Sequence, residues 1–218
     1  SKGNLMSQTS IFGYFRRSTA AFLAALLTAC AGGPGGTQPE SESVVPVRAA
    51  PTTYIQSGYA CCNLRYDGDQ IKDSNLGQLP FIAAGTPVRV KTIEDHVAQV
   101  DVDGRPMRLV LENRGAETIQ QWLARIVVGE DPRTRLAAYP PAVRDAIRAG
   151  KLAKGMTREQ VIMAVGYPQT SDKLPLDGPH WRYWWSGFSP YYVYWSRDKV
   201  SRIDGQGEVV GNVIFKGR

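Results

Sequence analysis

Residues 12–30 form a segment unlike that of a folded domain. Arg16 and Arg17 form a basic head, residues 20–27 form a short apolar run, and small residues close that run ahead of Cys30. The run is too short to cross about 30 Å of hydrocarbon as a helix. A basic segment, a short apolar run and small residues before the cleavage site are typical of an export signal. The fold must therefore be built from the residues that follow.

The last four residues of this segment, Leu-Thr-Ala-Cys at 27–30, resemble the lipobox of bacterial lipoprotein signals. The resemblance implies a signal peptide at 1–29, cleavage before Cys30, a diacylglycerol on its sulfur and an acylated amino terminus. Two or more acyl chains suffice for stable anchoring. Ala31 follows, whereas an aspartate there, by resemblance to known lipoproteins, would favour the inner membrane. The expected location is the periplasmic face of a Gram-negative outer membrane. An ordinary secretory signal with an incidental cysteine is the alternative.

The charge of the chain excludes one class of partner. Its formal net charge is +6, and removal of residues 1–29 takes away Lys2, Arg16 and Arg17 and no acid, which leaves +3. A mild positive charge without a long Lys/Arg block does not predict nucleic-acid binding. The expected partners are the membrane, through the lipid anchor, and an envelope protein, with peptidoglycan as the alternative.

Residues 30–53 are predicted to be the lipidated cysteine and a flexible tether. Gly, Pro, acidic and hydroxyl residues dominate residues 31–51, and no aromatic residue is present to begin a core. About twenty such residues in random coil reach roughly 25 Å on average. The folded part is therefore expected to stand clear of the lipid surface.

Residues 54–115 are predicted to form a small β-rich domain. Residues 88–93 and 97–102 alternate apolar and polar side chains, and residues 107–111 follow the turn Asp103-Gly104. An Asp-Gly pair between alternating runs predicts a hairpin, because both residues tolerate the positive φ of such turns.

The stretch Ala-Gly-Thr-Pro-Val-Arg-Val at 84–90, followed by this meander, resembles the bacterial Src-homology-3-like small barrels of envelope proteins. The resemblance implies a barrel-like shape and contacts with cell-wall peptides or other proteins. The strands around Arg89 to Met107 are the expected contact for peptidoglycan.

Residues 116–150 are predicted to be a helical connector. One apolar stripe at helical spacing predicts a helix over 117–128, and Pro132 is expected to stop its continuation. A second short helix is expected from Pro140-Pro141 to Gly150. The stripe consists of Ile119, Trp122, Leu123, Ile126 and Val127.

Residues 151–218 are predicted to form a second folded part. Thr157 and Gln160 make a capping box, and Gly166 stands where a helix would end. Alternating aromatic runs predict strands at 181–185 and 191–195. Further strands are expected at 199–203, after a turn at Arg197-Asp198, and at 209–215.

The pattern Gly-Met-Thr-x-x-Gln-Val, Val-Gly-x-Pro, Trp-x-Tyr and Val-x-Trp over 152–200 resembles the BamE/SmpA/OmlA family of small outer-membrane lipoproteins. The resemblance implies short helices packed on a three-stranded antiparallel sheet, hence an α+β fold. The best-known member is an accessory lipoprotein of the machine that inserts β-barrels into the outer membrane. The matching residues carry over the fold and not a binding site: Gly155, Met156, Thr157, Gln160, Val161, Gly166, Pro168, Trp181, Tyr183 and Val193. This chain departs from the family in about a hundred extra residues ahead of the motif and a long loop at 169–179.

Four of the five tryptophans and many tyrosines crowd residues 181–195. Because one face of an alternating sheet is buried, about half of these rings belong to the core. If Trp181, Tyr183 and Trp185 point inward, the expected outer set is Trp184, Tyr192 and Tyr194. Such a face indicates a contact surface, for the N-terminal part of the same chain, for a protein partner or for glycan.

Cys61 and Cys62 are adjacent, so a bond between them closes a small strained ring and is more easily reduced than a structural disulfide. The alternatives are two small buried hydrophobes, or pairing with a partner protein. A cysteine-dependent cell-wall hydrolase using His96 or His180 is a remote alternative, and no catalytic residue is assigned.

No cofactor or metal site is assigned. The cysteines and histidines lack the paired spacings of structural zinc. Asp67, Asp69 and Asp73 faintly resemble a calcium loop, but Gln78 stands where that loop needs a bidentate glutamate. The segment is interpreted as a polar turn. The predicted function is accordingly that of a binding or scaffold accessory factor in outer-membrane or envelope assembly.

Overall fold

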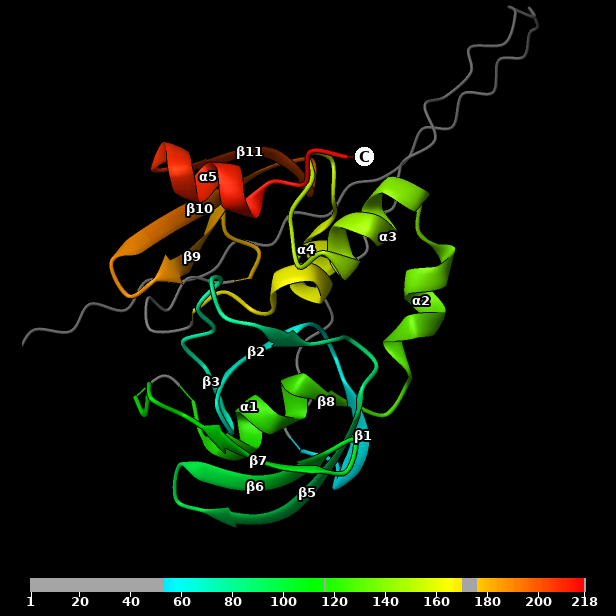
Figure 1. The fold of residues 1–218 in the computed structure, drawn as a ribbon, viewed down its shortest axis with the longest axis vertical. Helices are drawn as coiled ribbons and strands as arrows, with labels where there is room; N and C mark the ends of the chain where they lie inside the picture. Colours follow the sequence, from blue (N-terminus) through cyan, green and yellow to red (C-terminus); the bar gives the residue numbers. More distant parts are fainter. Residues whose placement is uncertain (1–52, 116, 170–175, 218) are drawn as a thin grey trace, which may run out of the picture. The chain divides into compact units, whose positions relative to one another are not determined.

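A computed structural model describes residues 53–115, 117–169 and 176–217 of the chain (Figure 1). The described residues all belong to one compact unit. The described part is mixed α+β, as expected, with a curled eight-stranded sheet, a three-stranded antiparallel sheet and five helices. Among its helices, none combines the length and the apolar character needed to span a bilayer. The predicted signal peptide and Cys30 lie outside the described residues.

The first sheet has the strand order β4-β2-β3-β7-β6-β5-β1-β8. Strands β5, β6 and β7 form the antiparallel meander that the alternating runs predicted. The short strand β8 pairs with β1 at one end of the order, and β3 pairs in parallel with β7 nearer the other. The bounds are β1 Ser57–Ala60, β2 Leu64–Asp67, β3 Gln70–Lys72, β4 Phe81–Ile82, β5 Pro87–Glu94, β6 Val97–Val102, β7 Arg105–Val110 and β8 Val127–Val128.

The predicted turn between β6 and β7 is confirmed. Asp103 and Gly104 have φ angles of 51° and 80°, and Val102 pairs with Arg105 across the hairpin. The alternation in these strands buries one side of each, so the curled sheet encloses apolar side chains such as Val100 and Leu109.

Three short helices follow: α1 (Ile119–Ile126), α2 (Pro132–Ala138) and α3 (Pro141–Arg148). Helices α1 and α3 fall within the predicted ranges. Helix α2 corrects the sequence analysis, in which Pro132 was expected only to stop a helix. Proline is favoured in the first turn, where its missing N–H has no helical partner. The Asp131 side chain caps this turn by accepting from the Arg133 N–H at 2.9 Å.

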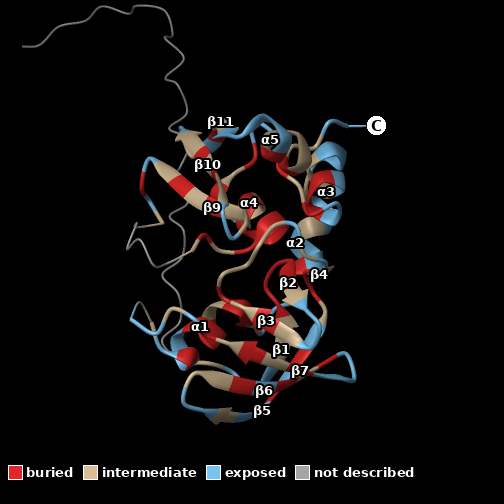
Figure 2. Cartoon of the chain, turned by 60° about the vertical axis from the view of Figure 1, so that its left-hand side comes forward, coloured by how far each residue is buried: buried red, intermediate tan, exposed pale blue. Residues whose placement is uncertain are grey.

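Helix α4 (Arg158–Val165) begins at the predicted capping box, since Thr157 and Gln160 each bond the other's backbone N–H. It ends at Gly166, whose φ of 80° and close approach to Asn75 leave no room for a Cβ. Most of the helix is buried, as its red ribbon in Figure 2 shows, while Glu159 in the first turn is exposed and Gln160 is half-buried.

The second sheet has the order β11-β10-β9 and consists of β9 (His180–Ser186), β10 (Ser189–Ser196) and β11 (Lys199–Gly205). Arg197 and Asp198 form the predicted turn, with φ of 49° and 55°. The strand expected at 209–215 is wrong, because helix α5 (Gly207–Val213) occupies most of that range. Val209 and Val213 lie one helical turn apart and are both buried, so they form the buried face of α5.

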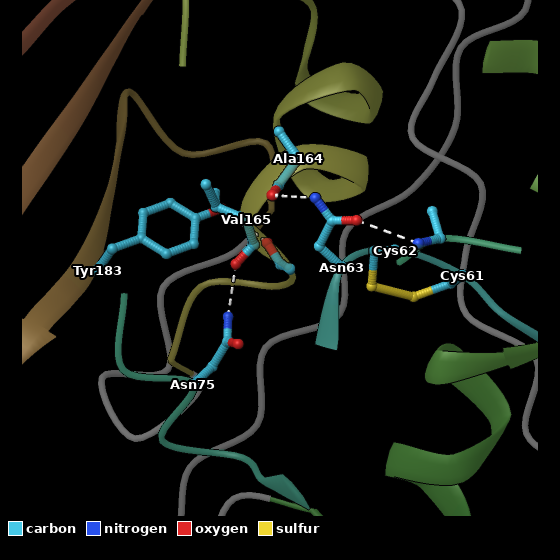
Figure 3. The surroundings of a disulfide bond; sticks show 9 residues. Cys61, Cys62, Asn63, Asn75, Ala164, Val165 and Tyr183 are labelled. Carbon is cyan, nitrogen blue, oxygen red and sulfur yellow. Dashed lines mark hydrogen bonds between the residues drawn. A yellow bond between two sulfur atoms is a disulfide. The ribbon is translucent and has the colours of Figure 1, made fainter. Parts of the chain in front are cut away.

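The carboxyl end of α4 joins the two sheets. A helix end leaves its last carbonyl oxygens without helical partners. At residues 163–166, donors from the first part of the chain and from β9 supply those partners (Figure 3). In order of acceptor from Met163 to Gly166, the donors are Asn63 N at 3.0 Å, Asn63 Nδ2 at 2.9 Å, Asn75 Nδ2 at 2.6 Å and the Tyr183 hydroxyl at 3.1 Å.

Candidate interaction surface

The three-stranded sheet separates its aromatic side chains onto two faces. On the inner face, Trp181, Tyr183, Tyr191 and Val193 are all at most 3 % exposed. Tyr183 and Tyr191 stack with ring centroids 5.4 Å apart. This face is part of the hydrophobic core and is not available to a partner.

On the outer face, Trp184, Tyr192 and Tyr194 are half-buried. The register places Tyr192 between Arg182 of β9 and Asp204 of β11. It places Tyr194 between His180 and Arg202 in the same way, and Trp184 opposite Pro190. The structure therefore brings the three predicted residues together on one side of one sheet.

Cationic side chains pack on these rings. The Arg202 guanidinium lies 4.1 Å from the Tyr194 ring centroid and pairs with Asp204 at 3.3 Å. Arg182 lies 5.2 Å from the Trp184 ring centroid. An aromatic ring attracts a cation through its quadrupole, so these contacts hold the rings and charges in place. His180 is also next to the Tyr194 ring, at 5.6 Å.

Trp185 does not join the buried set completely, contrary to the simplest alternation. The register shifts between Ser189 and Pro190, and Trp185 is half-buried against the core. At this end of β9, the N–H groups of Gly77 and Gln78 donate to the carbonyls of Trp184 and Trp185 at 2.8 and 3.0 Å. The first part of the chain therefore contacts the edge of β9.

Arg158 is an organising residue that the sequence analysis missed. The residue is 7 % exposed, and its guanidinium packs against both the Trp181 and the Trp195 ring, at 5.2 and 4.5 Å from their centroids. It donates to Asp198 at 3.0 Å and to the Leu176 carbonyl at 2.7 Å. Arg158 thus holds the chain just ahead of β9 in place. No short sequence motif around Arg158 predicts this role.

The sulfurs of Cys61 and Cys62 form a disulfide, and the two residues are 8 % and 0 % exposed (Figure 3). Cys62 lines a cavity of about 20 Å³ with Arg125, Glu117 and Tyr167. Arg125 pairs with Glu117 and lies 4.7 Å from the Tyr167 ring centroid. A space of this size holds a water molecule but not a small-molecule substrate. In this oxidised state neither cysteine offers a thiolate for nucleophilic chemistry.

The other polar candidates have structural partners. His96 contacts Asp95 and Arg114, each at 2.7 Å, on an exposed turn. Asp69 pairs with Arg108 at 3.0 Å, and Asp73 accepts from the Glu112 N–H at 2.7 Å. Within the described ranges, no group of three or more His, Cys, Asp or Glu side chains could hold a metal ion.

The buried tyrosines are poor acid–base groups at neutral pH. Burial raises the pKa of Tyr139 to about 12 and the pKa of Tyr183 well above its ordinary value. Burial also raises the pKa of Tyr191, and the nearby Arg65 opposes this only in part. These groups therefore keep their protons at neutral pH. Tyr183 and Tyr191 lie in the core, and Tyr139 is half-buried against it.

Comparison with known proteins adds no family to these observations. A scan against protein-family models, a search of curated proteins and a search of solved structures find no match to the chain.

Proposed function

We propose that this protein is a periplasm-facing outer-membrane lipoprotein that works by binding, as a scaffold or accessory factor in outer-membrane or envelope assembly. The observation that carries the proposal is the outer face of β9, β10 and β11. There Trp184, Tyr192 and Tyr194 remain half-exposed although the opposite face is filled by core side chains.

The composition of this face suits a protein partner. Tyrosine, tryptophan and arginine are the residues that dominate binding energy in protein interfaces. The outer face combines them with Arg182 and Arg202 packed on the rings. Because the face lies on a hydrogen-bonded sheet, little side-chain or backbone entropy is lost when a partner binds.

The arrangement of elements supports the proposed BamE-like domain. Helices α3 and α4 precede a three-stranded antiparallel sheet in sequence, and α4 packs in the core with it. This agrees with the arrangement that the resemblance implies. The lipid anchor at Cys30 is proposed from the sequence pattern alone.

Cell-wall binding is the second candidate, because exposed cations gather on the outward side of the β5–β7 meander. Arg89 and Lys91 of β5 are exposed there. Peptidoglycan stem peptides carry carboxylates that such cations attract. Co-sedimentation with purified peptidoglycan tests this candidate, and a double R89S/K91S variant should then remain in the supernatant.

The proposed function is tested by crosslinking the lipidated protein in native envelopes and identifying its partners by mass spectrometry. The Y192S variant is expected to lose the dominant partner, because it removes the central ring of the outer face. Y59S is the matched control, since Tyr59 is also a half-buried strand tyrosine but lies on the first sheet. Recovery of the same partner by wild type and Y192S would overturn the proposal for this face. The mass of the purified protein reports acylation of Cys30 independently.

A further inference from the structure

The turn between β9 and β10 presents a phenylalanine to solvent. Gly187 and Phe188 are the only two residues between the strands, and Phe188 is 94 % exposed. Within the described part of the chain, the other exposed large hydrophobic residue is Ile55, at 38 %. A single exposed apolar side chain is ordinary on protein surfaces, so Phe188 needs its surroundings to carry an argument.

Those surroundings are aromatic. Trp184 and Trp185 precede the turn and Pro190 follows it, all of them half-buried, and Pro190 pairs with Trp184 across the strands. We call residues 184–190 the hairpin tip. Trp184 and Pro190, which lie on the outer face, therefore extend the apolar surface of Phe188, whereas Trp185 packs against the core.

The hairpin tip itself carries no charge, and the charges behind it are mixed. Residues 184–190 contain no charged side chain, and Arg182 lies two residues behind Trp184. On β11, Asp204 lies opposite Tyr192 and pairs with Arg202. Tryptophan and tyrosine concentrate where membrane meets water, because their rings are apolar at one end and polar at the other. On the outer face, the projecting phenylalanine is followed by Trp184 and then by Arg182, which is this order of polarity.

We propose that the hairpin tip inserts Phe188 into the surface of a lipid bilayer. The inference rests on the proposed function in one respect, because an anchor at Cys30 would hold the domain near lipid. The predicted tether reaches roughly 25 Å on average in random coil, so it lets the folded part stand clear of the lipid surface and also lets the tip approach it. Insertion removes the exposed phenylalanine from water while the inner face of the sheet stays in the core.

The experiment measures tryptophan fluorescence of the full processed protein in phosphatidylcholine vesicles, with and without bromine on the acyl chains of part of the lipid. Bromine quenches only nearby rings, and all five tryptophans lie at or after residue 122, so the leader and tether contribute no signal. Wild-type emission is expected to fall in brominated vesicles. F188S is expected to lower the ratio of inserted to free tip about tenfold or more, because the serine has no ring to bury. I55S is the matched control and should be quenched like wild type.

Absence of quenching in wild type, or equal quenching of wild type and F188S, overturns the inference. A crosslink from position 188 to a protein instead of to lipid does the same. Unchanged far-UV circular dichroism and thermal melting of F188S exclude a folding defect, which is not expected at so exposed a position. If the mass shows that Cys30 is not acylated, the chain is added to the vesicles directly. A missing anchor and a tip that does not insert therefore give different results.

Discussion

The side-chain nitrogen Nδ2 of Asn63 lies 2.9 Å from the carbonyl oxygen of Ala164, across 101 positions of sequence. The same nitrogen donates to the Ile147 carbonyl at 2.7 Å, and Oδ1 accepts from the Ala84 N–H at 3.1 Å. Asn63 is 2 % exposed. One buried amide therefore links the first sheet, α3 and α4.

Asn63→Ala is expected to lower the free energy of unfolding by about 2–5 kcal/mol, because it leaves the Ala164 carbonyl and the Ala84 N–H without partners, whereas the Ile147 carbonyl still accepts from the Gly150 N–H at 2.9 Å. Urea unfolding followed by circular dichroism measures the change. Gln206→Ala is the control, since Gln206 is exposed and makes no capping hydrogen bond, and it should change the value by less than about 0.5 kcal/mol. A loss below about 1 kcal/mol for Asn63→Ala would show that the two sheets do not depend on this amide.

Arg158→Met tests the buried guanidinium that packs against Trp181 and Trp195. The substitution keeps an unbranched side chain but removes the donors to Asp198 and to the carbonyls ahead of β9. We expect a loss of about 2–4 kcal/mol in unfolding free energy, together with a changed near-ultraviolet circular dichroism signal from the two tryptophans. Arg148→Met, at a side chain 64 % exposed, should leave both measurements unchanged. An unaltered tryptophan signal in Arg158→Met would contradict the packing described.

Reduction of Cys61–Cys62 is expected to leave the protein folded. A disulfide between adjacent residues closes almost no loop, so in the chain-entropy description it contributes only about 1 kcal/mol. Urea unfolding with and without a dithiol reductant measures the difference, and alkylation followed by mass spectrometry confirms the reduced state. Unfolding on reduction in the absence of urea would disprove this expectation.

Stability is expected to fall at alkaline pH because of the buried tyrosines. Their folded-state pKa values lie above the unfolded value of 10.0, with Tyr139 at about 12 and Tyr183 and Tyr191 also raised. Above pH 10 the unfolded chain releases these protons while the folded chain keeps them, so the unfolding free energy decreases as pH rises. Below pH 10 the contribution is complete.

Absorbance of the phenolate during a pH titration checks this expectation. A group of tyrosines should ionise only together with loss of the circular dichroism signal. Tyr183→Phe should reduce the slope of stability against pH above 10 relative to the wild-type protein. An unchanged slope in Tyr183→Phe would contradict the assignment of Tyr183 to the core.

Local chemistry was sufficient to predict most elements. Thr157 and Gln160 place the start of α4, and Asp103-Gly104 and Arg197-Asp198 place their turns, because each depends on neighbours in sequence. The alternation of aromatic residues also separated the buried Tyr183 from the outer Tyr192. The wrong element predictions arose where one local sequence pattern is compatible with two secondary structures. Pro132 is as suitable for starting a helix as for stopping one, and the valines after residue 208 fit a helix face as well as a strand.

The sequence by itself determined the α+β class, the meander, the capping box and the two faces of the aromatic sheet, since periodicity and caps act within a few residues. Only the tertiary structure decided that Asn63 bonds Ala164, that Arg158 packs against two tryptophans, and that most of α4 is buried. These contacts join residues far apart in the chain. Their free energy comes from satisfying buried polar groups, and which groups are buried together depends on how the sheets pack.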